Sequence, residues 1–209
     1  MEDSNPHSET APTPIGGVAQ ETDPNLPGLS LQGLLDWTVE RCHHGAAVGG
    51  YAELTAHELG FSTEHAARVR LAGELHDIGK IIVPDRILCK PGRLDPAEWA
   101  LIRLHPGVGA KIIGAAGEPE LAHWVLCHHE RFDGRGYPHG VAGEAIPCES
   151  RILAIADSYE AMTSDRPYRV AMSHELAREE LLAGAGTQFD SEVVGAFLAA
   201  VSEPAARYS

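Results

Sequence analysis

The sequence predicts an all-α fold, a bundle of about seven to nine helices. Three observations predict it: apolar residues recur at helical spacing, long strand-like alternations are absent, and prolines fall between the apolar runs. Hydrophobic residues make up 44% of the chain but aromatic residues only 6%, so the core should be mostly aliphatic and alanine-based.

Two helix starts carry clear signals. Asp95 is a suitable N-cap, with Pro96 at the first helical position and Glu98 at the third. Ser62 and Thr63 can cap another helix, directly after Gly60 ends the one before. The predicted helical segments are one from Leu31 that includes His44, then 48–59, one from Ser62 to His76-Asp77, one from Asp95, 107–116, 119–130, 150–163, 173–183 and 190–201.

The domain organisation follows from composition. Residues 1–29 are rich in Pro, Ser, Thr, Gly and acids and contain no Lys or Arg, which predicts a disordered tail before a single ordered domain over 30–209. No signal peptide or membrane-spanning run is apparent, and the four cysteines are scattered, so we expect a cytoplasmic protein with reduced thiols. The net charge of −14 argues against duplex DNA or an anionic membrane as a partner.

Two pairs of residues suggest metal ligands. The adjacent His76 and Asp77 offer an imidazole nitrogen and a carboxylate that can bridge two metals, although alone they fit a packed imidazole and a helix cap equally well. His128 and His129 diverge by about 100° on a helix, which suits two different metals better than one.

Further candidates lie in other helical segments. Asp157 interrupts an apolar run, where an ionised carboxylate is costly unless it is paired or metal-bound, so a ligand role competes with a cap role. His105 and His44 can add nitrogens, and Glu40 stands four residues before His44 on the same helical face.

These residues, in this order, resemble the HD-GYP family, the HD-superfamily phosphohydrolases associated with breakdown of cyclic di-GMP. The resemblance covers about residues 38 to 200 and implies the HD-domain helical bundle. The matching segments are LHDIGK (75–80), ILCKPGRL (87–94), HPGVGAKI (105–112), HHERFDGRGYP (128–138), RILAIAD (151–157), SDRPYR (164–169) and GTQFD (186–190).

The resemblance implies roles residue by residue. Asp77 would bridge two metals, and Glu40 stands where some members have a carboxylate that permits a third. Lys80 matches a lysine that meets the phosphate or the bridging solvent, and Asp77 and Lys80 are therefore the expected catalytic pair. Tyr137, on a loop made sharp by its glycines, would form a lip over the substrate and stack on a guanine or bind a phosphate. The implied metal ligands are Glu40, His44, His76, Asp77, His105, His128, His129 and Asp157, and the implied dinucleotide contacts are Lys80, Tyr137, Arg166 and Arg169.

The expected activity is hydrolysis of cyclic di-GMP to pGpG, GMP or both, by attack of a hydroxide that bridges two or three divalent metals. Histidines mixed with carboxylates favour iron or manganese over zinc. Two alternatives stay open: hydrolysis of another cyclic dinucleotide, and a signalling module that binds the nucleotide or a partner, such as a diguanylate cyclase domain or a sensor protein, with little catalysis. The sequence also leaves open whether the chain forms a homodimer.

Three features depart from the family pattern. Ala47 replaces an arginine that family members often have, and Glu160 replaces an aspartate. The surroundings of His44 are unusually rich in glycine. These departures put the packing of the first helix and the affinity for substrate in question, but they leave the implied ligands in place.

Overall fold

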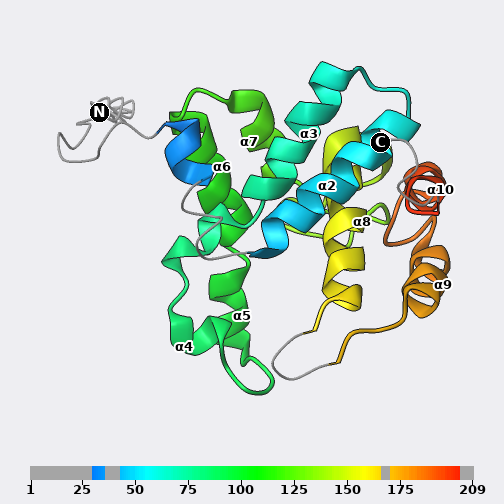
Figure 1. Cartoon of the computed structure of the whole chain (residues 1–209). Helices are drawn as coiled ribbons and strands as arrows, with labels where there is room; N and C mark the ends of the chain where they lie inside the picture. Colours follow the sequence, from blue (N-terminus) through cyan, green and yellow to red (C-terminus); the bar gives the residue numbers. More distant parts are fainter. Residues whose placement is uncertain (1–29, 36–42, 166–169, 203–209) are drawn as a thin grey trace, which may run out of the picture.

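The regular elements of the protein are helices, as Figure 1 shows for a computed structural model that describes residues 30–35, 43–165 and 170–202. No β-strand occurs within these ranges, where Ala185 and Phe189 form an isolated bridge. The all-α prediction is therefore confirmed. No helix among the described residues is long and apolar enough to span a membrane. The predicted tail, 1–29, lies outside the described residues.

The elements follow one another with short connections. Residues 30–35 contain a helical turn from 31 to 35. The named elements are α2 (His43–Glu58), α3 (Thr63–Leu75), the 3₁₀ helix η1 (Ile78–Ile82), α4 (Asp85–Leu88), α5 (Pro96–Ile102), α6 (His105–Ala115), α7 (Pro119–Leu126), the 3₁₀ helix η2 (Gly143–Ala145), α8 (Cys148–Thr163), α9 (His174–Gly184) and α10 (Ser191–Ala200).

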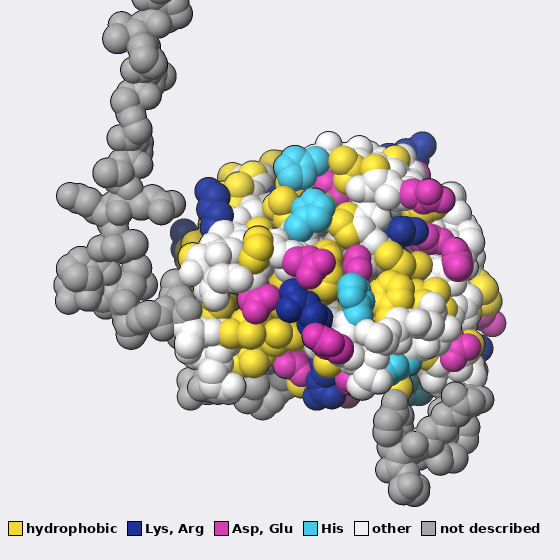
Figure 2. Space-filling view, turned by 90° about the horizontal axis from the view of Figure 1, so that it is seen from above, with side chains coloured by type: hydrophobic (Ala, Val, Ile, Leu, Met, Phe, Trp, Pro, Cys, Tyr) yellow, Lys and Arg dark blue, Asp and Glu magenta, His cyan; other side chains and the backbone are white. Residues whose placement is uncertain are grey.

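The core lies where α2 packs against α3, α8 and α10, and α6 and α7 pair beside α3 (Figure 1). Its buried side chains are mainly Ala, Val, Ile and Leu, with a few aromatics such as Phe197 and Trp124. The expectation of an aliphatic, alanine-based core is confirmed. Acidic side chains are spread over the face seen in Figure 2 instead of gathering in one patch.

The glycines around His44 allow the backbones of α2 and α3 to approach each other closely where the two helices cross. A Cβ on Gly45 would lie 2.7 Å from the carbonyl oxygen of Glu74, and one on Gly73 would lie 2.8 Å from Cα of Gly49. Side chains at these positions would force the two backbones apart. The glycine-rich departure from the family pattern therefore brings α2 close to α3 and places His44 beside His76.

The capping signals are confirmed. Asp95 accepts hydrogen bonds from the backbone of Ala97 and Glu98, and the Glu98 side chain returns one to the Asp95 backbone. Ser62 caps α3, and Gly60 follows α2 with a φ of +83°.

Other predicted bounds were wrong. The helix predicted over 48–59 begins at His43, five residues earlier. The helix predicted over 107–116 begins at His105, because Pro106 fits the first turn, where its missing N–H costs nothing. The segment predicted over 119–130 ends at Leu126, so His128 and His129 lie in the turn after α7.

Candidate metal centre

His76 and Asp77 lie at the junction of α3 and η1. His76 is the C-cap residue of α3, and its Nδ1–H donates to the carbonyl oxygen of Gly73 at 2.6 Å. Asp77 occupies the N-cap position of η1 but makes no side-chain capping bond. The interpretation of Asp77 as a cap is therefore wrong, and its buried carboxylate faces the neighbouring histidines.

Gly79 allows a third ligand candidate to reach this junction. A Cβ on Gly79 would lie 2.0 Å from the carbonyl oxygen of His105 and 2.6 Å from the amide nitrogen of Gly109. Only glycine permits this approach of η1 to the first turn of α6. The result is a separation of 3.4 Å between His105 Nε2 and Asp77 Oδ1.

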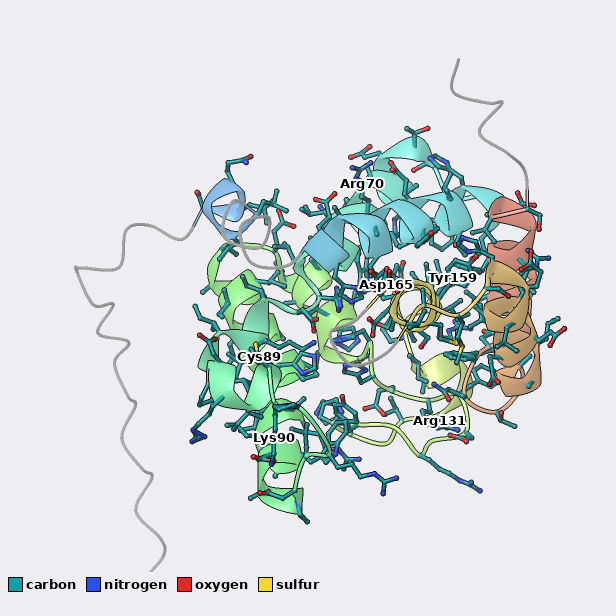
Figure 3. The ribbon with its side chains drawn as sticks, turned by 60° about the horizontal axis from the view of Figure 1, so that its bottom comes forward. Arg70, Cys89, Lys90, Arg131, Tyr159 and Asp165 are labelled. Carbon is teal, nitrogen blue, oxygen red and sulfur yellow. The ribbon has the colours of Figure 1, made fainter. Side chains whose placement is uncertain are left out.

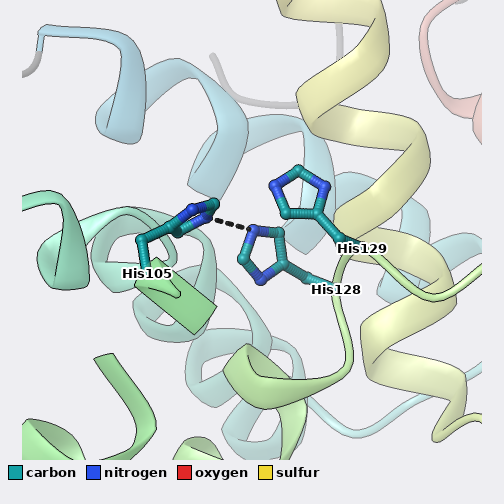
Figure 4. A group of neighbouring side chains, drawn as sticks. All are labelled: His105, His128 and His129. Carbon is teal, nitrogen blue, oxygen red and sulfur yellow. Dashed lines mark hydrogen bonds between the residues drawn. The ribbon is translucent and has the colours of Figure 1, made fainter. Parts of the chain in front are cut away.

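His105, His128 and His129 form one candidate ligand group (Figure 4). Each offers a ring nitrogen within 4.8 Å of the others. Nδ1–H of His105 donates to the carbonyl oxygen of Ile102 at 2.8 Å, and that of His128 donates to Val125 at 2.5 Å. Both rings consequently turn Nε2 inward, where the two atoms are 3.4 Å apart.

His44, His76 and Asp77 form the second candidate group, by the same distance criterion. Asp157 adjoins it from the middle of α8, so it is not a cap, and its Oδ1 lies 2.9 Å from His44 Nε2 and 3.8 Å from His76 Nε2. The other nitrogen of His44, Nδ1, contacts the carboxylate of Glu160.

Glu160 thus touches a ligand candidate directly. It lies one helical turn after Asp157 on α8, is buried, and also accepts a hydrogen bond from the Ser164 hydroxyl at 2.7 Å. Compared with the aspartate that the resemblance led us to expect, glutamate adds a methylene to the side chain that contacts His44.

The donor set fits divalent cations. His76 Nε2 and Asp77 Oδ1 are buried and have no hydrogen-bond partner among the described residues. Nδ1 of both His105 and His128 carries the proton, so in neutral rings the facing Nε2 atoms present lone pairs to each other. Such an arrangement is costly without a cation between the nitrogens, and neutral imidazoles with carboxylates are ligands of transition metals.

The electrostatics keep most of these groups ready to bind a cation. Burial lowers the pKa of His105, that of His128 well below its ordinary value, and that of His129 to about 4. Burial disfavours the charged form of Asp77, but His76 and Lys80 outweigh it and hold the pKa of this carboxyl well below its usual range.

Lys80 and Tyr137 lie beside the two groups. Lys80 Nζ donates to Asp77 Oδ2 at 2.5 Å. The Tyr137 ring stacks on His129, with centroids 4.8 Å apart and planes 27° apart, and Arg103 lies 5.0 Å from the Tyr137 centroid. Burial raises the pKa of Tyr137, so its hydroxyl remains a donor.

The loop that carries Tyr137 is closed over His129 by its own backbone. The amide of Tyr137 donates to the carbonyl oxygen of His129 at 3.1 Å, and a Cβ on Gly136 would lie 2.6 Å from that same oxygen. The fully buried carboxylate of Glu130 accepts from the amides of His139 at 2.7 Å and Gly140 at 3.0 Å.

The same loop is tied to the segment before α10. Arg131, which Figure 3 labels on the connection from α7 to α8, pairs with both carboxylate oxygens of Asp133 and donates to Gln188 at 2.8 Å. The backbone of Asp133 donates to Thr187 at 2.8 Å. The GTQFD segment therefore braces the GYP loop.

Most of the candidate site residues predicted from the sequence come together. Glu40, Arg166 and Arg169 lie outside the described residues. Sequence reasoning missed the bracing role of Glu130, the contact of Glu160 with His44, and Arg103. An acid directly after two histidines was a signal for Glu130, whereas Arg103 had none. The predicted residues that the structure brings into two adjoining groups, with their neighbours, are His44, His76, Asp77, Lys80, His105, His128, His129, Tyr137 and Asp157.

Comparison with known proteins agrees with this picture. A family model described as "HD domain" matches residues 30–193. A cyclic di-GMP phosphodiesterase of Thermotoga maritima is 41% identical over 163 residues, which are 77% of this chain and 44% of the relative. The 3′3′-cGAMP-specific phosphodiesterase 2 of Vibrio cholerae is 38% identical over 154 residues, covering 72% of this chain and 30% of the relative. The chain thus spans less than half the length of these curated relatives.

A solved structure shares the fold. The cyclic GMP-AMP-specific phosphodiesterase V-cGAP3 of V. cholerae superimposes with a TM-score of 0.63 at 20% identity, over 84% of this chain and 48% of that one. The family model and the curated relatives confirm the resemblance that the sequence motifs predicted, and this likeness shows that the fold is shared.

Proposed function

Because the chain belongs to the HD domain family, we propose that it is a metal-dependent phosphodiesterase that hydrolyses cyclic di-GMP to pGpG, GMP or both. The observation that carries the proposal is the pair of adjoining ligand groups, one of three histidines and one of two histidines and Asp77. Asp77 belongs to the second group and lies 3.4 Å from His105 of the first, so its carboxylate can serve both. A binding module without catalysis would not need this arrangement.

We assign one divalent ion to each group, with iron or manganese favoured by the mixed histidine and carboxylate donors. His105, His128 and His129 would hold one ion, and His44, His76 and Asp157 the other, with Asp77 shared; Glu40 would add a carboxylate for a third. When bound, the ions would activate water and polarise the phosphodiester.

The remaining residues act on the substrate. Lys80, held at Asp77 Oδ2, presents its ammonium where charge develops on the phosphoryl oxygens during cleavage. Tyr137 keeps its hydroxyl proton, so the hydroxyl can donate a hydrogen bond to a phosphate oxygen. Arg166 and Arg169 would neutralise the standing charge of the dinucleotide. A diguanylate cyclase domain or sensor protein as partner, a homodimer and a cytoplasmic location stay predictions.

A second substrate deserves a direct comparison. One relative is named as specific for 3′3′-cGAMP, and its identity to this chain, 38%, is close to that of the cyclic di-GMP phosphodiesterase. The two substrates differ in one base, so the base contacts and not the metal ligands would separate them.

The proposal is tested by anaerobic incubation of the protein, loaded with Fe(II) or Mn(II), with cyclic di-GMP or 3′3′-cGAMP, and chromatography of the products. We expect pGpG or GMP from cyclic di-GMP, with a higher kcat/KM than for 3′3′-cGAMP, and no product from Asp77→Ala. Nucleotide binding without product from either metal form would instead support the binding module.

A further inference from the structure

The Tyr137 ring has two close neighbours. The imidazole of His129 stacks at 4.8 Å, and the guanidinium of Arg103 lies over the ring at 5.0 Å. Tyr137 therefore connects Arg103 to His129, a member of the histidine group.

Arg103 is positioned by the same turn that positions a ligand candidate. It is the C-cap residue of α5, and its amide donates to the carbonyl oxygen of Trp99 at 3.0 Å. His105, two residues later, is fixed by its bond to Ile102. The backbone of Arg103 is thus held between two hydrogen bonds, and its exposed side chain extends over Tyr137.

Arg103 differs in its pairing from several other arginines of the described residues. Among the described residues it forms no ion pair, whereas Arg68, Arg70, Arg131 and Arg151 each contact a carboxylate. In a chain with a net charge of −14, a cation beside a candidate active site that has no acidic partner among the described residues suits an anionic ligand.

We infer that Arg103 binds the phosphate of the cyclic dinucleotide that is not being cleaved, an inference that rests on the proposed function. Arg103 neighbours Tyr137, which in turn stacks on His129 of the histidine group, where the other phosphate would react. The Arg103 guanidinium, 5.0 Å from the Tyr137 centroid, carries N–H donors and a positive charge that suit a phosphate oxygen. Lys80 is engaged with Asp77, and Arg103 adds a cation for a dianionic substrate.

The test compares wild type, Arg103→Ala and Arg103→Lys, with Lys111→Ala as the control. Lys111 is an exposed cation on α6 that forms no ion pair with described residues, so its loss changes the net charge equally. The readouts are kcat and KM for cyclic di-GMP with the Mn(II)-loaded protein, and calorimetric binding of a phosphorothioate analogue that resists hydrolysis.

We expect Arg103→Ala to raise KM and Kd by about tenfold or more, the effect of losing a charge-assisted hydrogen bond, with little change in kcat. Arg103→Lys should recover much of the affinity, because a phosphate accepts a point charge, and Lys111→Ala should behave as wild type. Equal affinity of Arg103→Ala and wild type would overturn the role of Arg103 but not the proposed function. So would an Arg103→Lys variant as weak as Arg103→Ala, since that pattern indicates stacking on a base. A wild type that neither binds nor cleaves the nucleotide would overturn the proposed function itself.

Discussion

His76, His105 and His128 use the same local hydrogen bond to direct a ring nitrogen into the site. Each donates Nδ1–H to the carbonyl oxygen of the residue three positions earlier, at a helix end where that oxygen has no amide partner. This bond fixes the tautomer and leaves Nε2 to face the centre. The sequence indicated which histidines matter, but the tautomers depend on helix ends that it placed incorrectly for His128.

His44 is the exception, because a carboxylate and not a carbonyl meets its Nδ1. A carboxylate partner makes an imidazole a more basic ligand. Glu160 was recognised from the sequence only as a departure from the family pattern. Its contact with His44 depends on the packing of α8 against α2, which no local sequence signal reports.

Glu160→Gln should weaken metal binding at the His44 group by about 10- to 100-fold, because the amide keeps an acceptor for His44 but loses the charge. Titration of metal-free protein with Mn(II) against a competing chelator measures this. Glu179→Gln, an exposed change of the same kind on α9, should bind as wild type. Unchanged affinity in Glu160→Gln would mean that Glu160 does not support His44.

At the scale of elements, close backbone approaches at glycines bring the ligand-bearing segments together. Gly79 brings η1 against α6, and Gly45 and Gly73 bring α2 against α3. The sequence predicted that Gly79 turns the chain after His76-Asp77. It could not show which backbone approaches Gly79, because His105 is 26 positions away along the chain. The sequence also did not predict the end of α7 at Leu126, because no Gly or Pro follows that residue until Gly134.

Gly79→Ala should lower the free energy of unfolding by about 3 kcal/mol, since its Cβ would collide with backbone atoms of α6 that cannot move independently. Gly107→Ala is the matched control within α6. A Cβ there has no neighbour within 4 Å, so alanine should stabilise the helix by about 0.5 to 1 kcal/mol. Urea denaturation of both variants measures the difference, and equal stability of the two would contradict this account of Gly79.

At the scale of the whole molecule, composition and periodicity were sufficient to predict an all-α fold with an alanine-rich core. Capping residues located several helix starts. The arrangement of the helices was accessible only through the family resemblance, because it depends on contacts such as α2 against α10 between residues more than a hundred positions apart. The short elements η1 and α4 carried no periodic signal long enough to identify them.

The buried histidines should make the metal-free protein sensitive to acid. Histidines of the unfolded chain titrate near pH 6.5, whereas burial lowers the folded-state pKa of His129 to about 4 and also lowers those of His105 and His128. Between these values the unfolded state binds protons that the folded state does not, so stability falls as the pH falls from 6.5 to about 4.

The contribution of His76 to stability depends on pH in the opposite direction. Despite its burial, Asp77 and Asp157 raise the pKa of His76, so the stability that this residue contributes declines as the pH rises above 6.5. Urea denaturation of chelator-treated protein from pH 4 to 8 measures both effects. In His129→Gln the free energy of unfolding should fall less steeply as the pH drops below 6.5. An equally steep fall in wild type and His129→Gln would contradict the lowered pKa of His129.

We propose that the two adjoining groups hold the metals on which the phosphodiesterase activity depends. The most direct measurement is a stepwise anaerobic titration of metal-free protein with Mn(II), following metal bound per chain and cyclic di-GMP turnover in the same samples. We predict that turnover appears only as two ions load, and that His128→Ala loses metal and turnover together. Turnover by the metal-free protein, or full turnover by His128→Ala, would contradict it.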